Sequence, residues 1–165
     1  MRALLVALML IFGSQAGADA AKIWKVVSPS VVSVLPTWPG YTNPGFGAPV
    51  GAAPEGTGIA ISKDGYILTA AHVIAKATEI EIRDVNNKLA AAHPVFVSAE
   101  TDLAIIKVDV ETFEIEFSDG VPEIGSETCL LSNSFGLGLG ITCGVVSAIG
   151  RKNIGFNRTE DFIQT

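Results

Sequence analysis

Short runs in which apolar and polar residues alternate fill much of the chain and predict β-strands. Six such runs, each with one apolar side, are separated by tight turns. They lie at 31–35, 57–62, 66–69, 79–83, 88–97 and 103–108. Because six short strands with one buried face can close on themselves and leave no exposed edge, this pattern predicts a small closed antiparallel barrel.

The turns between these runs have the expected chemistry. Lys63-Asp64-Gly65 separates the second and third runs, and Asp-Gly is a strong hairpin signal because glycine accepts a positive φ. Asn86-Asn87 marks another turn. Beyond the six runs, Pro122 and Gly125 interrupt the pattern, and two further strands are predicted near 127–132 and 141–149. The last residues, 161–165, read as the start of one more strand.

Two segments before the second run differ from this pattern. Ile23, Val26 and Val27 have the spacing of one helix face, which predicts a short helix over 22–28 that Pro29 ends. Residues 36–56 hold five prolines and five glycines and predict an irregular surface loop. Its aromatic residues can pack or bind a partner: they are Trp38, Tyr41 and Phe46.

The N-terminal 20 residues have the pattern of a secretory signal peptide. Arg2 precedes an unbroken apolar run at 3–12, and small residues follow in two triplets, 14–16 and 18–20, either of which could be the cleavage site. A membrane anchor is the alternative, but a span needs about 20 apolar residues, and no other run is long enough. We therefore expect an exported, soluble mature chain.

Export places Cys129 and Cys143 in an oxidising compartment, where they can form a disulfide. The alternative is two small buried residues that never meet, and the sequence alone leaves both open.

Composition excludes several function classes. A chain of 165 residues with 48% hydrophobic and 17% charged residues is not a disordered polar tail. A net charge of −6 argues against nucleic acid as a partner. Two histidines and two cysteines are too few for a clustered metal site, so no metal and no cofactor is predicted.

His72 and Asp102 are the candidate catalytic residues. His72 directly follows the strand run 66–69, at a barrel rim, and Asp102 opens the run 103–108. If the carboxylate turns inward, it can accept a hydrogen bond from the imidazole and stabilise the imidazolium that forms when Nε2 takes a proton. His93, which precedes a proline, is read as structural.

No residue of the chain has the setting of a nucleophile. None of the serines after residue 70 lies in a glycine-rich turn of the G-x-S-x-G kind, and Ser132-Asn133-Ser134-Phe135-Gly136 comes nearest. The two cysteines lie within predicted strands. The glycines at 136, 138 and 140 lack the lysine and helix of a phosphate loop.

Taken together, the motifs resemble the trypsin-like serine proteases of the bacterial HtrA/Deg group. The resemblance covers four stretches in order: Val27-Ser28-Pro29-Ser30-Val31-Val32-Ser33-Val34, Gly56 through Ile74, Thr101 through Val108, and Ser134 through Arg151 with Phe162-Ile163-Gln164-Thr165. It implies an all-β, trypsin-like double β-barrel with the first six-stranded barrel present and the second incomplete. It further implies that His72 is the general base and Asp102 its orienter.

The resemblance also implies an activity and a setting. We expect an exported serine endopeptidase of the protein quality control type, periplasmic or secreted, that acts on unfolded or misfolded proteins and forms trimers in its full-length form. The family's glycine-serine-glycine turn with the nucleophile is not in these 165 residues, so we expect a fragment that is inactive by itself. The alternative is a non-catalytic exported β-barrel protein that binds or scaffolds.

This interpretation divides the chain into four parts. They are a signal peptide at 1–20, a short helix, first strand and Pro/Gly-rich loop at 21–56, the remainder of the first barrel at 57–120, and the beginning of a second barrel at 121–165.

Overall fold

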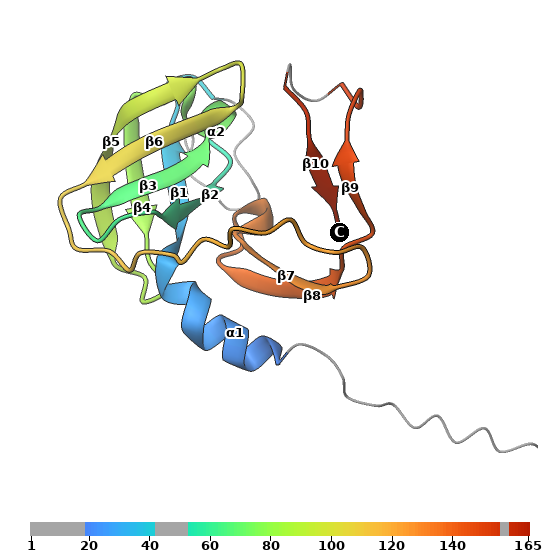
Figure 1. Cartoon of the computed structure of the whole chain (residues 1–165). Coiled ribbons are helices and arrows are strands. Elements are labelled where there is room, and N and C mark those ends of the chain that lie inside the picture. The colour runs from blue at the N-terminus through green and yellow to red at the C-terminus, as the bar shows by residue number, and fades with distance from the viewer. Residues whose placement is uncertain (1–18, 42–52, 156–158) are drawn as a thin grey trace, which may run out of the picture.

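The computed structural model describes residues 19–41, 53–155 and 159–165 (Figure 1). The helices and short 3₁₀ turns are α1 (Ala20–Val27), η1 (Ser28–Ser30), α2 (Ala71–Ile74) and η2 (Ser134–Gly136). The strands are β1 (Val31–Thr37), β2 (Gly56–Ala60), β3 (Tyr66–Ala70), β4 (Glu79–Arg83), β5 (Leu89–Ser98), β6 (Leu103–Val108), β7 (Glu127–Ser132), β8 (Gly140–Val145), β9 (Ala148–Arg151) and β10 (Phe162–Gln164).

The first six strands form a closed antiparallel barrel in the order β1-β2-β3-β6-β5-β4, which confirms the predicted architecture. Alternation along each strand sends one set of side chains inside. Val34, Ile67, Ile106 and Val108 are fully buried there. These residues belong to one core cluster that fills the barrel. The core supports the turns and short helices attached to the ends of the barrel strands.

Turn residues work as the sequence predicts. Gly65 has φ of +90°, and a side chain there would overlap the Val108 carbonyl, so the turn between β2 and β3 requires glycine. Asn87 has φ of +63° in the turn between β4 and β5, a conformation that asparagine tolerates better than most residues.

The predicted Pro/Gly loop is shorter at both ends than expected. Pro36 and Thr37 belong to β1, and Gly56 begins β2. Proline is tolerated at position 36 because β2 pairs with β1 only as far as Val34, which leaves β4 as the one paired neighbour there. Trp38 and Tyr41 pack edge to face, with ring centroids 5.5 Å apart, whereas Phe46 lies outside the described residues.

Two separate strand pairs follow the barrel, and they do not close into a second one (Figure 1). β7 pairs with β8, and β9 pairs with β10. The single strand predicted near 141–149 is wrong, because the chain leaves the β7–β8 ladder after Val145. The Val146 N–H bonds to the Ser126 carbonyl, and the Ser147 N–H bonds to the Gln164 carbonyl.

Cys129 and Cys143 face each other across β7 and β8 and form a disulfide, which decides between the two alternatives. At the other end of the described chain, α1 begins slightly earlier than predicted, at Ala20, where the Asp19 carboxylate accepts a hydrogen bond from the Lys22 N–H. α1 contacts β7 and β8.

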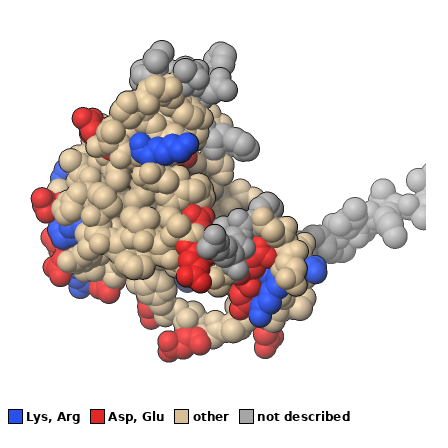
Figure 2. Space-filling view, turned by 90° about the horizontal axis from the view of Figure 1, so that it is seen from above, with Lys and Arg blue, Asp and Glu red and all other residues tan. Residues whose placement is uncertain are grey.

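The molecular surface carries few charges on the face seen in Figure 2. Much of the barrel surface there is neither acidic nor basic, and acidic side chains gather towards its edges. Among the residues that the structure describes, no helix has the length and apolar character needed to cross a membrane.

Candidate active site

His72 lies in α2, the single helical turn at the upper end of the barrel in Figure 1. β3 delivers the chain to this turn and pairs with β6 up to Ala70↔Leu103. The turn is tied to the barrel by its neighbours, since Ala71 and Ile74 are buried in the core. His72 is therefore held at a fixed point on the rim while its ring remains exposed.

Close packing of α2 also requires a glycine in β2. A side chain at Gly56 would place its Cβ only 2.6 Å from a Val73 methyl group, too close for the two to coexist. Glycine at 56 thus lets the turn that carries His72 settle directly on β2. This role of Gly56 was not predicted from the sequence, where the only signal for it is a glycine at the start of a strand.

Asp102 immediately precedes β6 and has a left-handed backbone, with φ of +57°. A non-glycine residue in this conformation is uncommon, although aspartate is among those that tolerate it best. Here the conformation is supported by three hydrogen bonds to α2. The Asp102 carbonyl accepts from the Ala71 N–H at 2.9 Å, and Oδ1 accepts from the His72 N–H at 2.9 Å.

The third hydrogen bond joins the two side chains. His72 Nδ1 lies 2.7 Å from Asp102 Oδ2. Because a carboxylate only accepts hydrogen bonds, Nδ1 carries the proton, and the neutral ring keeps its Nε2 lone pair free. These two residues lie 30 positions apart in the sequence, and the fold brings them together so that the imidazole can act as a base.

The Asp102 carboxyl is held in its ionised form. Partial burial by itself would raise its pKa, but the hydrogen bonds from the His72 ring and backbone N–H, together with the His72 charge, lower the pKa below its ordinary value. An ionised carboxylate at this place stabilises an imidazolium on His72.

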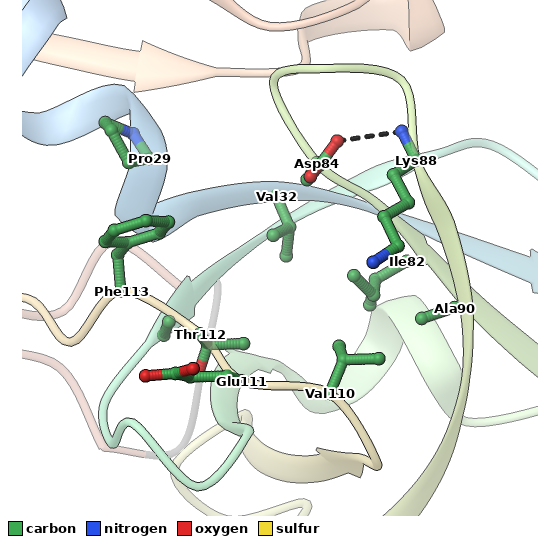
Figure 3. Close-up of a pocket in the computed structure, with 11 residues that line it drawn as sticks. Pro29, Val32, Ile82, Asp84, Lys88, Ala90, Val110, Glu111, Thr112 and Phe113 are labelled. Carbon is green, nitrogen blue, oxygen red and sulfur yellow. Dashed lines mark hydrogen bonds between the residues drawn. The ribbon is translucent and has the colours of Figure 1, made fainter.

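The pair lies on an open surface. The His72 side chain is 73% exposed and that of Asp102 is 22% exposed. A cavity of about 70 Å³ lies elsewhere, near the opposite ends of the barrel strands, between apolar side chains and the turn in which the Lys88 N–H bonds to Asp84 Oδ1 (Figure 3). Neither His72 nor Asp102 lines it.

The other predicted residues lie apart from this pair. His93 is exposed on β5, opposite Lys107 of β6. The hydroxyls of Ser132 and Ser134 bond to each other at 2.9 Å. Within residues 19–41, 53–155 and 159–165, no hydrogen bond joins a serine to His72, and no three histidine, cysteine or acidic side chains gather as metal ligands.

Comparisons with known proteins agree with this geometry. A family model described as a trypsin-like peptidase domain matches residues 56–165. The chain is 36% identical over 115 residues to a probable periplasmic serine endoprotease, DegP-like, of Chlamydia trachomatis, covering 68% of this chain and 23% of that protein. It is 33% identical over 115 residues to the periplasmic serine endoprotease DegP of Escherichia coli K12, covering 67% of this chain and 24% of DegP.

Solved structures show the same relationship. The HtrA-type protease AlgW, solved with a tripeptide, superposes with a TM-score of 0.74 at 31% identity, covering 89% of this chain and 46% of that chain. A serine endoprotease from Yersinia pestis superposes with a TM-score of 0.69 at 28% identity, covering 82% and 47%. This chain therefore spans less than half the length of each of these relatives. The closed barrel, the unclosed second sheet and the sequence matches together show that the chain belongs to the trypsin-like peptidases of the HtrA/Deg group.

Proposed function

We propose that this chain supplies the base half of a serine endopeptidase site, in which His72 is the general base and Asp102 its orienter. The observation that carries the proposal is the 2.7 Å contact between His72 Nδ1 and Asp102 Oδ2. That contact leaves Nε2 free to take the proton of an attacking hydroxyl and later return it to the leaving amine.

A general base without a nucleophile does not catalyse peptide hydrolysis efficiently. Loss of the nucleophile typically costs a factor of about 10⁶ in rate, and no described serine bonds to His72. We therefore expect negligible peptidase turnover from these residues by themselves.

The names of the relatives support the setting that the sequence predicts. Those relatives are periplasmic serine endoproteases. We propose export of this chain to the periplasm or beyond the cell, unfolded or misfolded proteins as substrates, and trimers as the assembled form of a full-length enzyme.

A chimera tests the catalytic roles directly. Residues 21–165 replace the matching segment of E. coli DegP, whose own remaining chain follows, and hydrolysis of a fluorogenic peptide is measured. We expect turnover that His72→Ala lowers by about 10⁶ and Asp102→Asn by about 10⁴.

His93→Ala is the matched control, because it removes the other imidazole of the chain from the outer barrel wall. Its turnover should equal that of the unsubstituted chimera. Equal turnover in the His72→Ala chimera would contradict the proposal and favour the non-catalytic binding role.

A further inference from the structure

A buried asparagine joins the second strand pair to the barrel. Asn133, just after β7, is 3% exposed, and its backbone N–H and both polar atoms of its side chain form hydrogen bonds. Its N–H donates to Thr57 Oγ1 at 2.9 Å, its Nδ2 donates to Glu55 Oε2 at 2.5 Å, and its Oδ1 accepts from the Gly138 N–H at 2.8 Å. One side chain therefore links the start of β2 to the turn between β7 and β8.

Glu55, just before β2, is the partner of the Asn133 side chain on the barrel side. Its Oε2 also accepts from Arg83 Nη2 at 2.5 Å, at the end of β4. The carboxylate is thus shared between a guanidinium and an amide, and both side chains of the ion pair are less than 30% exposed. Hydrogen bonds to a charged group in such a partly dry place are among the stronger ones in proteins.

Segment 55–57 also packs against the turn that carries His72. Gly56 packs against Val73, the residue after His72. The Thr57 carbonyl accepts a hydrogen bond from the Thr69 hydroxyl at 2.8 Å, and Thr69 is buried three positions before His72. Within this segment, Glu55 and Thr57 therefore bond to Asn133, whereas Gly56 packs against the His72 turn.

Further packing fixes the turn that follows Asn133. Gly136 has φ of +70°, and its Cα lies against the Glu55 side chain, so that an added Cβ would be 3.7 Å from Glu55 Cγ. Figure 1 shows this short orange turn between the barrel and the β7–β8 pair.

We propose that Asn133 is a positioning residue, and that the cluster of Asn133, Glu55, Thr57 and Arg83, here called the Asn133 clasp, sets the orientation of the β7–β8 pair relative to the His72 turn. Groups carried on the second sheet would thereby be presented to the base at a fixed geometry. The proposal rests on the proposed function only for the role of His72.

The central test swaps the two hydrogen-bonding partners. Asn133→Asp removes the Nδ2 donor and places a second acceptor-only carboxylate against Glu55. Combining Asn133→Asp with Glu55→Gln restores one amide and one carboxylate in exchanged positions and returns the net charge to that of the original chain. If the orientation of the β7–β8 pair depends on this hydrogen bond, it should be lost in the single variant and recovered in the double variant.

The readouts separate orientation from overall stability. Residual dipolar couplings report whether the amides of β1–β6 and of β7–β8 share one alignment tensor, and hydrogen exchange reports local opening. For the unsubstituted chain we expect one tensor. For Asn133→Asp we expect two tensors and a loss of protection of about ten- to a hundredfold at the residue 133 amide, which bonds to Thr57 Oγ1 of the barrel, with the Val108 amide of the barrel unchanged, and recovery of both in the double variant.

Three results would overturn the proposal. They are a single tensor with undiminished protection of the residue 133 amide in Asn133→Asp, no recovery in the double variant, and equal loss of protection at residue 133 and Val108, which would make Asn133 a support of the whole fold. If Asn133→Asp yields no folded protein, Thr57→Val decides, because it removes only the acceptor of the Asn133 N–H and keeps the side-chain shape. It should then produce the two tensors, and one tensor would refute the clasp.

The His72 backbone N–H provides an independent check on the proposed function. It bonds to Asp102 Oδ1 within the barrel, so its protection should not change in any of these variants. A failure of the clasp proposal can therefore be detected without any measurement of peptidase activity. An inactive DegP chimera would contradict the proposed function and would not alter the clasp measurements.

Discussion

The closed barrel and the two strand pairs after it differ in what holds them together. Of the buried apolar side chains in the described part of the chain, all but Val146 lie between residues 31 and 108. The later strands leave large apolar residues such as Leu130, Val145 and Ile149 at least 40% exposed. The β7–β8 pair is held instead by a disulfide and by polar contacts, among them those of Asn133.

This contrast explains why the base and its orienter already have their geometry. Both belong to segments attached to the filled barrel, and every hydrogen bond between them stays within it. We therefore expect the His72–Asp102 contact to stay unchanged when the second part shifts or loosens. The two regions should therefore respond differently to the same kind of substitution.

The largest effect is expected from the barrel core. Ile106→Ala removes a fully buried side chain and should lower the free energy of unfolding by about 2–5 kcal/mol. Ile149→Ala is the matched control, because it makes the same chemical change on β9 at a side chain that is 40% exposed. It should cost about 0.5 kcal/mol or less.

Urea denaturation of both variants, followed by circular dichroism, measures these free energies. Equal losses would mean that the second part is as tightly packed as the barrel, which would contradict the contrast.

The next effect is expected from the disulfide. Reduction of Cys129–Cys143 with a dithiol opens a loop closed over a separation of 14 residues, a constraint of about 3 kcal/mol in the chain-entropy model. The loss should be confined to β7 and β8. Hydrogen exchange before and after reduction should show faster exchange at the Leu130 and Thr142 amides, which belong to the neighbouring pair of the β7–β8 ladder, and no change at Ile67 or Ile106.

A Cys129→Ala, Cys143→Ala double variant serves as control, since it should behave like the reduced chain and ignore the dithiol. Faster exchange at Ile67 on reduction would show that the barrel depends on the bridge.

The contrast also marks what the sequence could predict. The alternation around Ile80 and Ile82, or around Ala104 and Ile106, is strong because one side of each strand fills the barrel, and those strands were predicted within two residues at each end. Strand β8 was predicted too long because Val145 and Val146 continue the apolar run, although only Val146 is buried. Hydrophobicity alone does not show where a ladder ends in a weakly packed sheet.

The candidate site divides in the same way. His72 and Asp102 were identified from their places at the ends of strands and from the resemblance, and the structure brings them into contact. The left-handed backbone of Asp102 and the pairing of Asn133 with Glu55 were not predicted. Both depend on contacts between residues 30 to 78 positions apart, for which no local pattern exists.

The smallest effect is expected from the charge of Asp102, and its pH dependence tests whether the site belongs to the barrel. Asp102→Asn keeps a residue that tolerates the left-handed backbone but removes the carboxylate. Because contact with His72 lowers the pKa of Asp102, its stabilising contribution is complete above the ordinary aspartate pKa of about 4 and is lost as the pH falls through the lower, folded-state value. We expect the free energy of unfolding of the original chain to exceed that of the variant by about 1 kcal/mol at neutral pH, with the difference disappearing under acid conditions.

Asp109→Asn is the control, since its carboxylate is 91% exposed beside Lys107, and it should change stability little at any pH. Urea denaturation between neutral and acid pH gives both curves. A difference for Asp102→Asn that grows as the pH falls would mean that the folded chain disfavours the ionised carboxylate, which is incompatible with an orienter that stabilises an imidazolium.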